Sequence, residues 1–327
     1  MYPVPYADPE QAVQFAIDAE RQGFDSVWAN DHIDTPAYVR AGFQDPPRFY
    51  DPYGYLAFVA ARTSRIRLAT AITVMSFRHP AVLAKQACTL DQLSGGRFVL
   101  GLGIGAYASE SAVVWPAGTL HRGRQAGEYL QAVQLLMTQR RASFHGDYVN
   151  FDDVESFPKP VHGAVPVLSG GNSAQAIERA ARFARGWLPA GLLPPEIAAA
   201  ATRIRELADR HERVLPADFD IAPQFTVRLG RTTQEALACF ERTALRAHDI
   251  SLAASTLKDQ QDGDWRDRDL IGSVQEVVDR IGRYRDSGVT TLAGLLFAAD
   301  DVAQTRDQIA WFAESVMPAF AGSGEGS

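Results

Sequence analysis

The pattern of apolar and polar positions predicts a strand, a helix and a second strand between Ile66 and Glu110. An apolar run from Ile66 to Met75 precedes a helix-length segment, Pro80 to Leu93, and a second apolar run, Arg97 to Leu102, follows. Two continuously hydrophobic strands joined by a covering helix are typical of a buried parallel sheet. Because ligands of such folds bind at the carboxyl ends of strands, the residues after these two runs are candidates for a functional site.

The rest of the chain repeats this alternation. Helix signals such as Asp8-Pro9-Glu10, where an aspartate N-cap precedes a proline, separate the apolar runs. Further strands are predicted at 24–29, 165–169, 186–189, 219–229 and 289–297, and helices at 9–22, 51–63, 121–140, 174–184, 195–211, 232–240, 273–285 and 301–316. A hairpin is predicted at 142–151, around His145-Gly146-Asp147.

Seven clear strands alternating with helices favour an α/β fold of the (β/α)8 (TIM) barrel type over a doubly wound sheet. The eighth strand has to precede the first helix. Either Tyr2 to Tyr6 is an abbreviated first strand, or the sequence begins inside the fold. We expect one domain over residues 1–320, with a polar insertion at 241–269 and a disordered tail at 321–327.

Composition excludes several classes of function. The hydrophobic fraction is 46%, yet no apolar window of 18 residues indicates a membrane span, and the start of the chain lacks the pattern of a signal peptide. A net charge of −7 gives no support for nucleic-acid binding. The two cysteines, Cys88 and Cys239, form neither a disulfide framework nor a zinc site, which favours a cytoplasmic protein. The histidines show no metal-binding spacing, so no metal is expected.

Two predicted strands end in polar residues that are candidates for chemistry. Asp31-His32 follows the strand at 24–29, where an imidazole can exchange a proton and a carboxylate can orient a cofactor ring. The alternative is an aspartate that caps a turn and a solvated histidine. Thr73-Val74 ends the run that begins at Ile66, where a distorted backbone could face a planar ring, and an ordinary strand end is the alternative.

Two glycine-containing segments also follow strands. Gly103-Ile104-Gly105 is only a fragment of a dinucleotide-binding pattern, and a close-approach turn against a flat ligand fits it as well. Gly170-Gly171-Asn172-Ser173 opens a helix, and free amides there suit a phosphate. The alternative for this segment is a glycine turn followed by helix capping.

Several blocks of the sequence, in order, resemble the bacterial luciferase-like superfamily. They are AERQGFDSVWANDH, TLDQLSGGRFVLGLGIG, FHGDYVNF followed by FPKPV, VPVLSGGNS and ARGWLP. The resemblance extends from Glu10 to Phe312 and is weakest across 241–269.

The resemblance implies a (β/α)8 barrel that binds a flavin or a deazaflavin at its carboxyl face, and a homodimer. It implies a non-prolyl cis peptide at Thr73-Val74, beside the ring. Asp31 and His32 match the ring-proximal pair of the family and 170–173 its phosphate-side loop, and Ser109 joins the candidate contacts. Sugar-phosphate dehydrogenases of the family have a glutamate directly after the Gly-x-Gly, where this chain has Ala106. Glu110, four residues on, can be read as part of a helix start.

Three functions are therefore weighed. The first is an oxidoreductase that uses coenzyme F420 (8-hydroxy-5-deazaflavin) and a small organic substrate, with His32 as proton donor or acceptor and Asp31 orienting His32 or the coenzyme. The second is an FMN-dependent monooxygenase that receives reduced flavin from a separate reductase. The third is a barrel that binds a ligand or partner without turnover.

Overall fold

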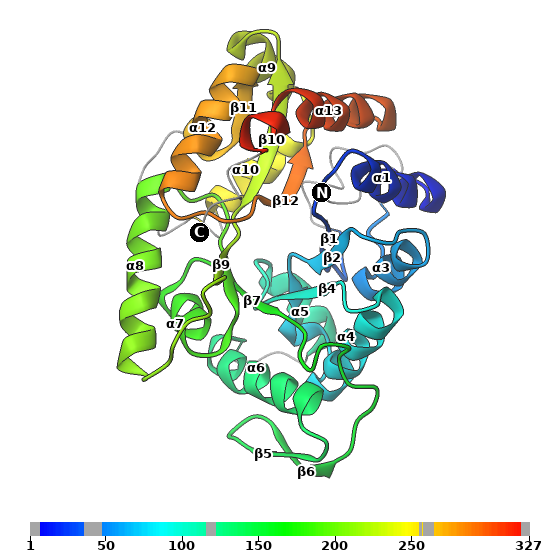
Figure 1. The fold of residues 1–327 in the computed structure, drawn as a ribbon, viewed down its shortest axis with the longest axis vertical. Helices are drawn as coiled ribbons and strands as arrows, with labels where there is room; N and C mark the ends of the chain where they lie inside the picture. The colour runs from blue at the N-terminus through cyan, green and yellow to red at the C-terminus, as the bar shows by residue number, and fades with distance from the viewer. Residues whose placement is uncertain (1–6, 36–47, 116–121, 255–256, 258–264, 322–327) are drawn as a thin grey trace.

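The protein is described by a computed structural model that covers residues 7–35, 48–115, 122–254, 257 and 265–321 (Figure 1). The predicted first strand at Tyr2 to Tyr6 lies outside these residues, and so does the predicted tail at 321–327 except for Ala321. Within them, no helix combines the length and the hydrophobicity that crossing a membrane requires.

A curled parallel sheet organises the fold. Its strands follow the order β1 (Ser26–Ala29), β2 (Arg67–Thr70), β4 (Phe98–Gly103), β7 (Val167–Gly170), β8 (Gly186–Leu188) and β9 (Asp220–Ile221), and β3 (Thr73–Val74) pairs with β4. A second parallel sheet places β10 (Gln224–Gly230) between β11 (Leu270–Ser273) and β12 (Ala293–Phe297). An isolated parallel bridge joins Ala190 to Gln224, and β12 contacts β1, so the two sheets continue each other.

Most of the helices cover the outer face of these sheets (Figure 1). Their bounds are α1 (Pro9–Arg21), α3 (Pro52–Ala60), α4 (Pro80–Ser94), α5 (Ala108–Val114), α6 (Arg122–Thr138), α7 (Ala174–Phe183), α8 (Pro194–Arg210), α9 (Thr233–Phe240), α10 (Leu245–Ala254), α11 (Trp265–Arg268), α12 (Val274–Asp286) and α13 (Val302–Ser315), with 3₁₀ turns η1 (Met75–Phe77) and η2 (Met317–Phe320). Side-chain caps start several of them, and Asp8 and Ser273 each complete a capping box.

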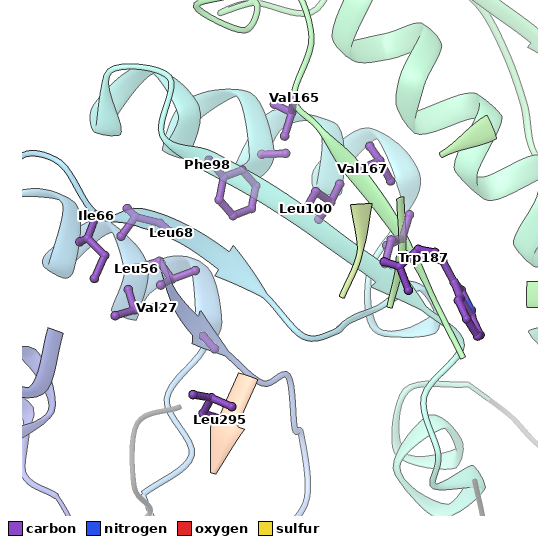
Figure 2. Packing of buried hydrophobic residues seen from close by; sticks show 14 of the residues in the cluster. Val27, Leu56, Ile66, Leu68, Phe98, Leu100, Val165, Val167, Trp187 and Leu295 are labelled. Atoms are coloured by element: carbon purple, nitrogen blue, oxygen red, sulfur yellow. The ribbon is translucent and has the colours of Figure 1, made fainter. Parts of the chain in front are cut away.

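The strands are hydrophobic throughout because both of their faces are buried. Outward side chains such as Leu68 and Leu100 pack against the helices, in the cluster shown in Figure 2. The alternate residues, among them Trp28, Ala69 and Val99, form a separate cluster on the inner face of the curled sheet. This arrangement is the one that alternating side chains of a helix-covered parallel strand produce, and it confirms the buried parallel sheet expected from the sequence.

The structure differs from the sequence-based expectation in four places. The strand predicted at 219–229 forms two strands, β9 and β10, which lie in different sheets. The run from Ile66 to Met75 is not one strand: it forms β2, a break at Ala71-Ile72, β3 and η1. The polar segment 241–269 contains α10 and α11, and β11 follows it directly. The short helix α5, after β4, was also not predicted. The hairpin of β5 (Ala142–His145) and β6 (Asn150–Val154) is confirmed.

Candidate active site

Most of the candidate residues lie at one edge of the curled sheet. Because β1, β4 and β7 are parallel, their carboxyl ends share that edge, and the segments that follow them begin there. The edge therefore brings together Asp31, His32, the β3 segment, Gly103 to Glu110, and the loop at 170–173.

Asp31 is buried and forms an ion pair with the guanidinium group of Arg78. Both terminal nitrogens of Arg78 donate to the carboxylate, one at 2.5 Å and the other at 3.0 Å, and the amide of Val74 donates to it at 2.9 Å. Burial disfavours the charge on Arg78, but the hydrogen bond and the charge of Asp31 outweigh this and raise the pKa of Arg78. Asp31 thus holds β3 in place. The roles expected for Asp31 from the sequence, orienting His32 or the coenzyme, stay predictions.

Buried hydroxyl groups support the break between β2 and β3. Tyr53 and Thr73 share a hydrogen bond of 2.9 Å, Thr73 donates to Thr70 at 3.1 Å, and Thr70 donates to the carbonyl of Gly101 at 2.9 Å. The non-prolyl cis peptide lies at Ala71-Ile72, not at Thr73-Val74. The prediction placed it two residues too late, because the break in the run comes before β3 and not after it.

The glycines at this edge leave room for the side chains of Ile72, at the break between β2 and β3, and of Val74, in β3. A Cβ atom added to Gly103 would lie 2.4 Å from Ile72 Cδ1, and one added to Gly170 would lie 2.7 Å from Ile72 Cγ2. Gly105 has a φ of +75°, and a Cβ atom added to it would lie 2.9 Å from Val74 Cγ1. Close packing against Ile72 and Val74 thus accounts for all three glycines. The close approach of Gly103 and Gly105 to a flat ligand, expected from the sequence, stays a prediction.

His32 is paired with Glu110. Its Nδ1 lies 2.8 Å from Glu110 Oε1, and the two side chains are 18% and 5% exposed. Phe49 and Tyr107 lie beside the imidazole, with ring centroids 5.0 and 6.2 Å away. With Glu110 ionised, the neutral imidazole carries its proton on Nδ1, which leaves Nε2 free to accept or return a proton.

Sequence reasoning missed the role of Glu110. The residue does lie in the first turn of α5, as a helix start would require, but it is buried and faces a histidine 78 positions earlier in the chain. The acidic residue at a helix start was the only sequence signal, and it is too common to indicate a site.

Helix α10 adds residues to this site from the segment first interpreted as an insertion. Ser251 shares a hydrogen bond of 3.1 Å with the hydroxyl group of Tyr107. His248, on the same helix, has its pKa lowered to about 4 by burial and secondarily by the nearby His32. His248 is therefore a neutral imidazole near the His32–Glu110 pair.

A buried carboxyl pair anchors α10. Asp249 is 9% exposed, its Oδ1 accepts a long hydrogen bond of 3.5 Å from Thr226 Oγ1, and its Oδ2 has no partner among the described residues. Asp269 accepts a hydrogen bond of 2.9 Å from the amide of Thr226. Burial and the neighbouring carboxyl group raise the pKa of Asp249, and burial raises that of Asp269.

The loop at 170–173 is held by β8 and by the residues that follow it. Trp187 Nε1 donates to the carbonyl of Gly171 at 2.8 Å, and the side chain of Asn172 forms two hydrogen bonds with the backbone of Ala190, at 2.8 and 3.1 Å. Ser173 is the N-cap of α7. The capping role considered from the sequence is therefore present, and it leaves the first amides of α7 directed outward from the helix end.

Ser109, a candidate cofactor contact from the sequence, is exposed in the first turn of α5. The part of the chain that the structure describes holds no group of three or more histidine, cysteine, aspartate or glutamate residues that could bind a metal ion.

The chain is similar to curated proteins over about half of its length. Among curated proteins, the chain is 33% identical over 187 residues to an F420-dependent glucose-6-phosphate dehydrogenase of Kineococcus radiotolerans, a match that covers 55% of this chain and 52% of that relative. The chain thus spans about half the length of this relative.

Solved structures match over nearly the whole chain. The monooxygenase RslO1 from Streptomyces bottropensis superposes with a TM-score of 0.79 at 23% identity, covering 96% of this chain and 94% of that one. An F420-dependent secondary alcohol dehydrogenase, solved with an F420–acetone adduct, gives 0.76 at 21% identity, covering 97% and 96%. The oxygenating constituent of 3,6-diketocamphane monooxygenase from Pseudomonas putida, solved with FMN, gives 0.70 at 21% identity, covering 96% and 95%. These likenesses show the fold.

The family model for luciferase-like monooxygenases matches residues 2–291. The resemblance seen in the sequence blocks is thereby confirmed, and the chain belongs to the luciferase-like monooxygenase family.

Proposed function

We propose that this protein is a deazaflavin (F420)-dependent oxidoreductase that transfers a hydride between C5 of the cofactor and a small organic substrate. The observation that carries the proposal is the His32–Glu110 pair at the carboxyl edge of the sheet. An imidazole held in one tautomer by a buried carboxylate is suited to exchange a proton with a substrate oxygen. F420 is named for the curated relative and for one of the structural neighbours.

The residues at this edge fit a flat cofactor with a phosphate. β3, buttressed by Asp31, gives a fixed backbone segment beside Gly103 and Gly105, where the lack of side chains lets two backbones approach closely. The capped end of α7 offers outward amides for an anion. We propose that the cofactor is held by Asp31, Thr73, Val74, Gly103, Gly105, Ser109, Gly170, Gly171, Asn172 and Ser173, within the (β/α)8 barrel typical of the family.

When bound, the deazaflavin supplies a carbon that accepts or gives a hydride. The chain supplies the proton. His32 exchanges it at Nε2, Glu110 holds the tautomer through Nδ1, and the low pKa of His248 keeps that second imidazole uncharged, so that it does not compete for the carboxylate. Tyr107 and Ser251 tie α10 to the same site, which limits the access of water.

Cofactor binding separates this proposal from an FMN-dependent monooxygenase, the second candidate, which the FMN-bound neighbour favours. The apoprotein is titrated with F420 and with FMN. We expect micromolar or tighter binding of F420 and much weaker binding of FMN. The reverse order would replace the proposed function with the monooxygenase, and binding without turnover of any alcohol or aldehyde would favour a non-catalytic barrel.

Variants of the pair test the proton transfer. We expect His32→Ala to lower kcat about 10²–10⁴-fold, the usual contribution of general acid–base catalysis, while cofactor affinity changes little. Glu110→Gln should lower kcat less and shift its pH profile. The control is His145→Ala, which removes an exposed histidine that pairs with Asp152 on the hairpin. An unchanged kcat in His32→Ala would remove His32 from the mechanism.

A further inference from the structure

A groove of about 540 Å³ lies on the outside of the sheet, between α6 and α7. The two helices are neighbours in Figure 1, and Gln134 of α6 donates to the carbonyl of Phe183 at the end of α7, at 2.7 Å. The groove runs from Ala174 in the first turn of α7 to Phe183 in its last, a length of about 15 Å at 1.5 Å per residue. It therefore begins next to the loop at 170–173 and continues away from the candidate active site.

A buried, uncompensated arginine lines this groove. Arg179 is only 5% exposed, its Nε is buried without a hydrogen-bond partner, and the described residues provide no ion pair for its guanidinium group. Burial alone lowers the pKa of Arg179, and no neighbouring charge offsets it. An arginine nonetheless stays protonated in proteins, so the groove contains a cation that has lost water without gaining a counterion.

The other charges of the groove do not satisfy Arg179. Glu128 accepts hydrogen bonds from the amides of Asp147 and Tyr148 in the hairpin, and Glu178 is paired with His211 at 2.8 Å. Arg124 and Arg182 add two exposed cations to the lining. Glu178 also lies 3.9 Å from Arg182 of the same groove, so Arg182 is partly compensated. Arg179 is left without a carboxylate partner among the described residues, and Arg124 adds an exposed cation beside it, which favours an anionic ligand.

We propose that this groove binds the part of the deazaflavin cofactor that extends beyond its phosphate, a flexible tail of carboxylates, and that one carboxylate pairs with Arg179. The inference rests on the proposed function, which places the phosphate at 170–173, directly at the start of the groove. A tail that leaves this point along α7 meets Arg179 after less than two turns of helix. Pairing then compensates the buried guanidinium, whose planar donors suit a carboxylate.

The test compares two forms of the cofactor on two forms of the protein. Wild type and Arg179→Met are titrated, by quenching of cofactor fluorescence, with the full deazaflavin and with the same molecule truncated at the phosphate. We expect truncation to weaken binding to the wild type about tenfold, the size of a charge-assisted pair. We expect Arg179→Met to weaken the binding of the full cofactor by the same factor, and to weaken the binding of the truncated form less than twofold. Arg203→Gln, on the exposed face of α8, should change neither.

Stability gives a second readout that a purely structural arginine would not reproduce. Without ligand, Arg179→Met should be at least as resistant to urea as the wild type, because the substitution removes a cation that has no counterion and keeps the apolar stem. Arg179→Lys should retain most of the preference for the full cofactor. The preference of the wild type for the full cofactor over the truncated form should also decrease when ionic strength rises.

Three outcomes would overturn the inference. Arg179→Met could lose the same affinity for both cofactor forms, it could lose affinity for neither, or the wild type could bind both forms with the same affinity. In each of them the cofactor still binds, so the proposed function stands. If neither deazaflavin form binds the wild type and FMN does, the proposed function fails and the inference fails with it.

Discussion

At the scale of single residues, the candidate site depends on two neighbours in the sequence that face different partners. Asp31 and His32 both follow β1, but Asp31 pairs with Arg78, whereas His32 pairs with Glu110. One residue fixes the backbone of the site and the other is placed to exchange a proton. A carboxylate and an imidazole side by side in a sequence need not act on each other.

The Asp31–Arg78 pair yields a prediction about stability. Asp31→Asn leaves the guanidinium group of Arg78 buried without its main counterion, since the Arg78 side chain is 11% exposed and its other carboxylate, Asp51, is farther away at 3.6 Å. Removing one partner of a buried pair costs about 3–5 kcal/mol. We expect a loss of this order in the free energy of unfolding, measured in urea.

The matched control is Arg140→Gln, because its pair with Glu155 is exposed. Such pairs contribute about 0–1 kcal/mol. If Asp31→Asn were no more destabilising than this control, Asp31 would not hold β3, and a direct role at the cofactor would become the better explanation of its burial.

At the scale of secondary-structure elements, α10 decides how the site is covered. The helix reaches the site through Ser251 and His248, and it is seated on the strands through Asp249. The groups facing Asp249 are Asp269, which raises its pKa, Arg246, which lowers it, and the hydroxyl group of Thr226. The charges of Arg280 and Arg268 lower the pKa of Asp269, against the effect of burial. A carboxyl group in this position is expected to keep its proton near neutral pH.

This protonation makes the stability of the protein depend on pH. An aspartate in the unfolded chain loses its proton near pH 3.9, whereas the pKa of Asp249 in the folded protein is raised to about 8. Between these values the folded state binds more protons than the unfolded state, so the contribution of Asp249 to the free energy of unfolding falls as pH rises, and it levels off above pH 8.

Asp249→Asn, which has no proton to lose, should remove this dependence. We expect the variant to gain stability relative to the wild type between pH 5 and pH 8.5, by at least about 1 kcal/mol in urea unfolding. Asp300→Asn, at an exposed position, serves as the control and should show no such change. A difference between Asp249→Asn and wild type that stays constant with pH would show that Asp249 is ionised throughout.

At the scale of the whole molecule, the candidate site joins segments from both sheets. His32 follows β1, Glu110 follows β4, and α10 lies between β10 and β11 in the sequence. A ligand bound there contacts only the folded chain, because the unfolded chain separates these segments. Binding should therefore stabilise the protein by about 2.7 kcal/mol at a free ligand concentration of 100 Kd.

We expect this stabilisation as a rise of several degrees in Tm when F420 is added, and a smaller rise with FMN at the same concentration. His32→Ala should show the same rise with F420 as the wild type, since its role lies in turnover. A rise with FMN alone would contradict the choice of cofactor. Loss of the F420 effect in His32→Ala would show that His32 contributes to binding.

Much of the architecture could be predicted because it depends on local patterns. The helices begin at recognisable caps such as Asp8 and Ser273, and the strands appear as apolar runs because both of their faces are buried. The break at Ala71-Ile72 escaped prediction, since an apolar run looks the same whether it is one strand or two. α10 escaped it because its segment is polar and weakly periodic, and β11 escaped it because it is a run of only four residues directly after that segment.

The sequence by itself determined the alternation of strands and helices, the family, and the edge at which polar residues gather, because each of these is encoded by neighbours within a few positions. Only the tertiary structure decided which side chains meet. The packing of distant segments pairs His32 with Glu110 and Asp31 with Arg78. It also leaves Arg179 without a counterion in its groove. Charge and burial at these positions depend on distance in space, which spacing along the chain does not record.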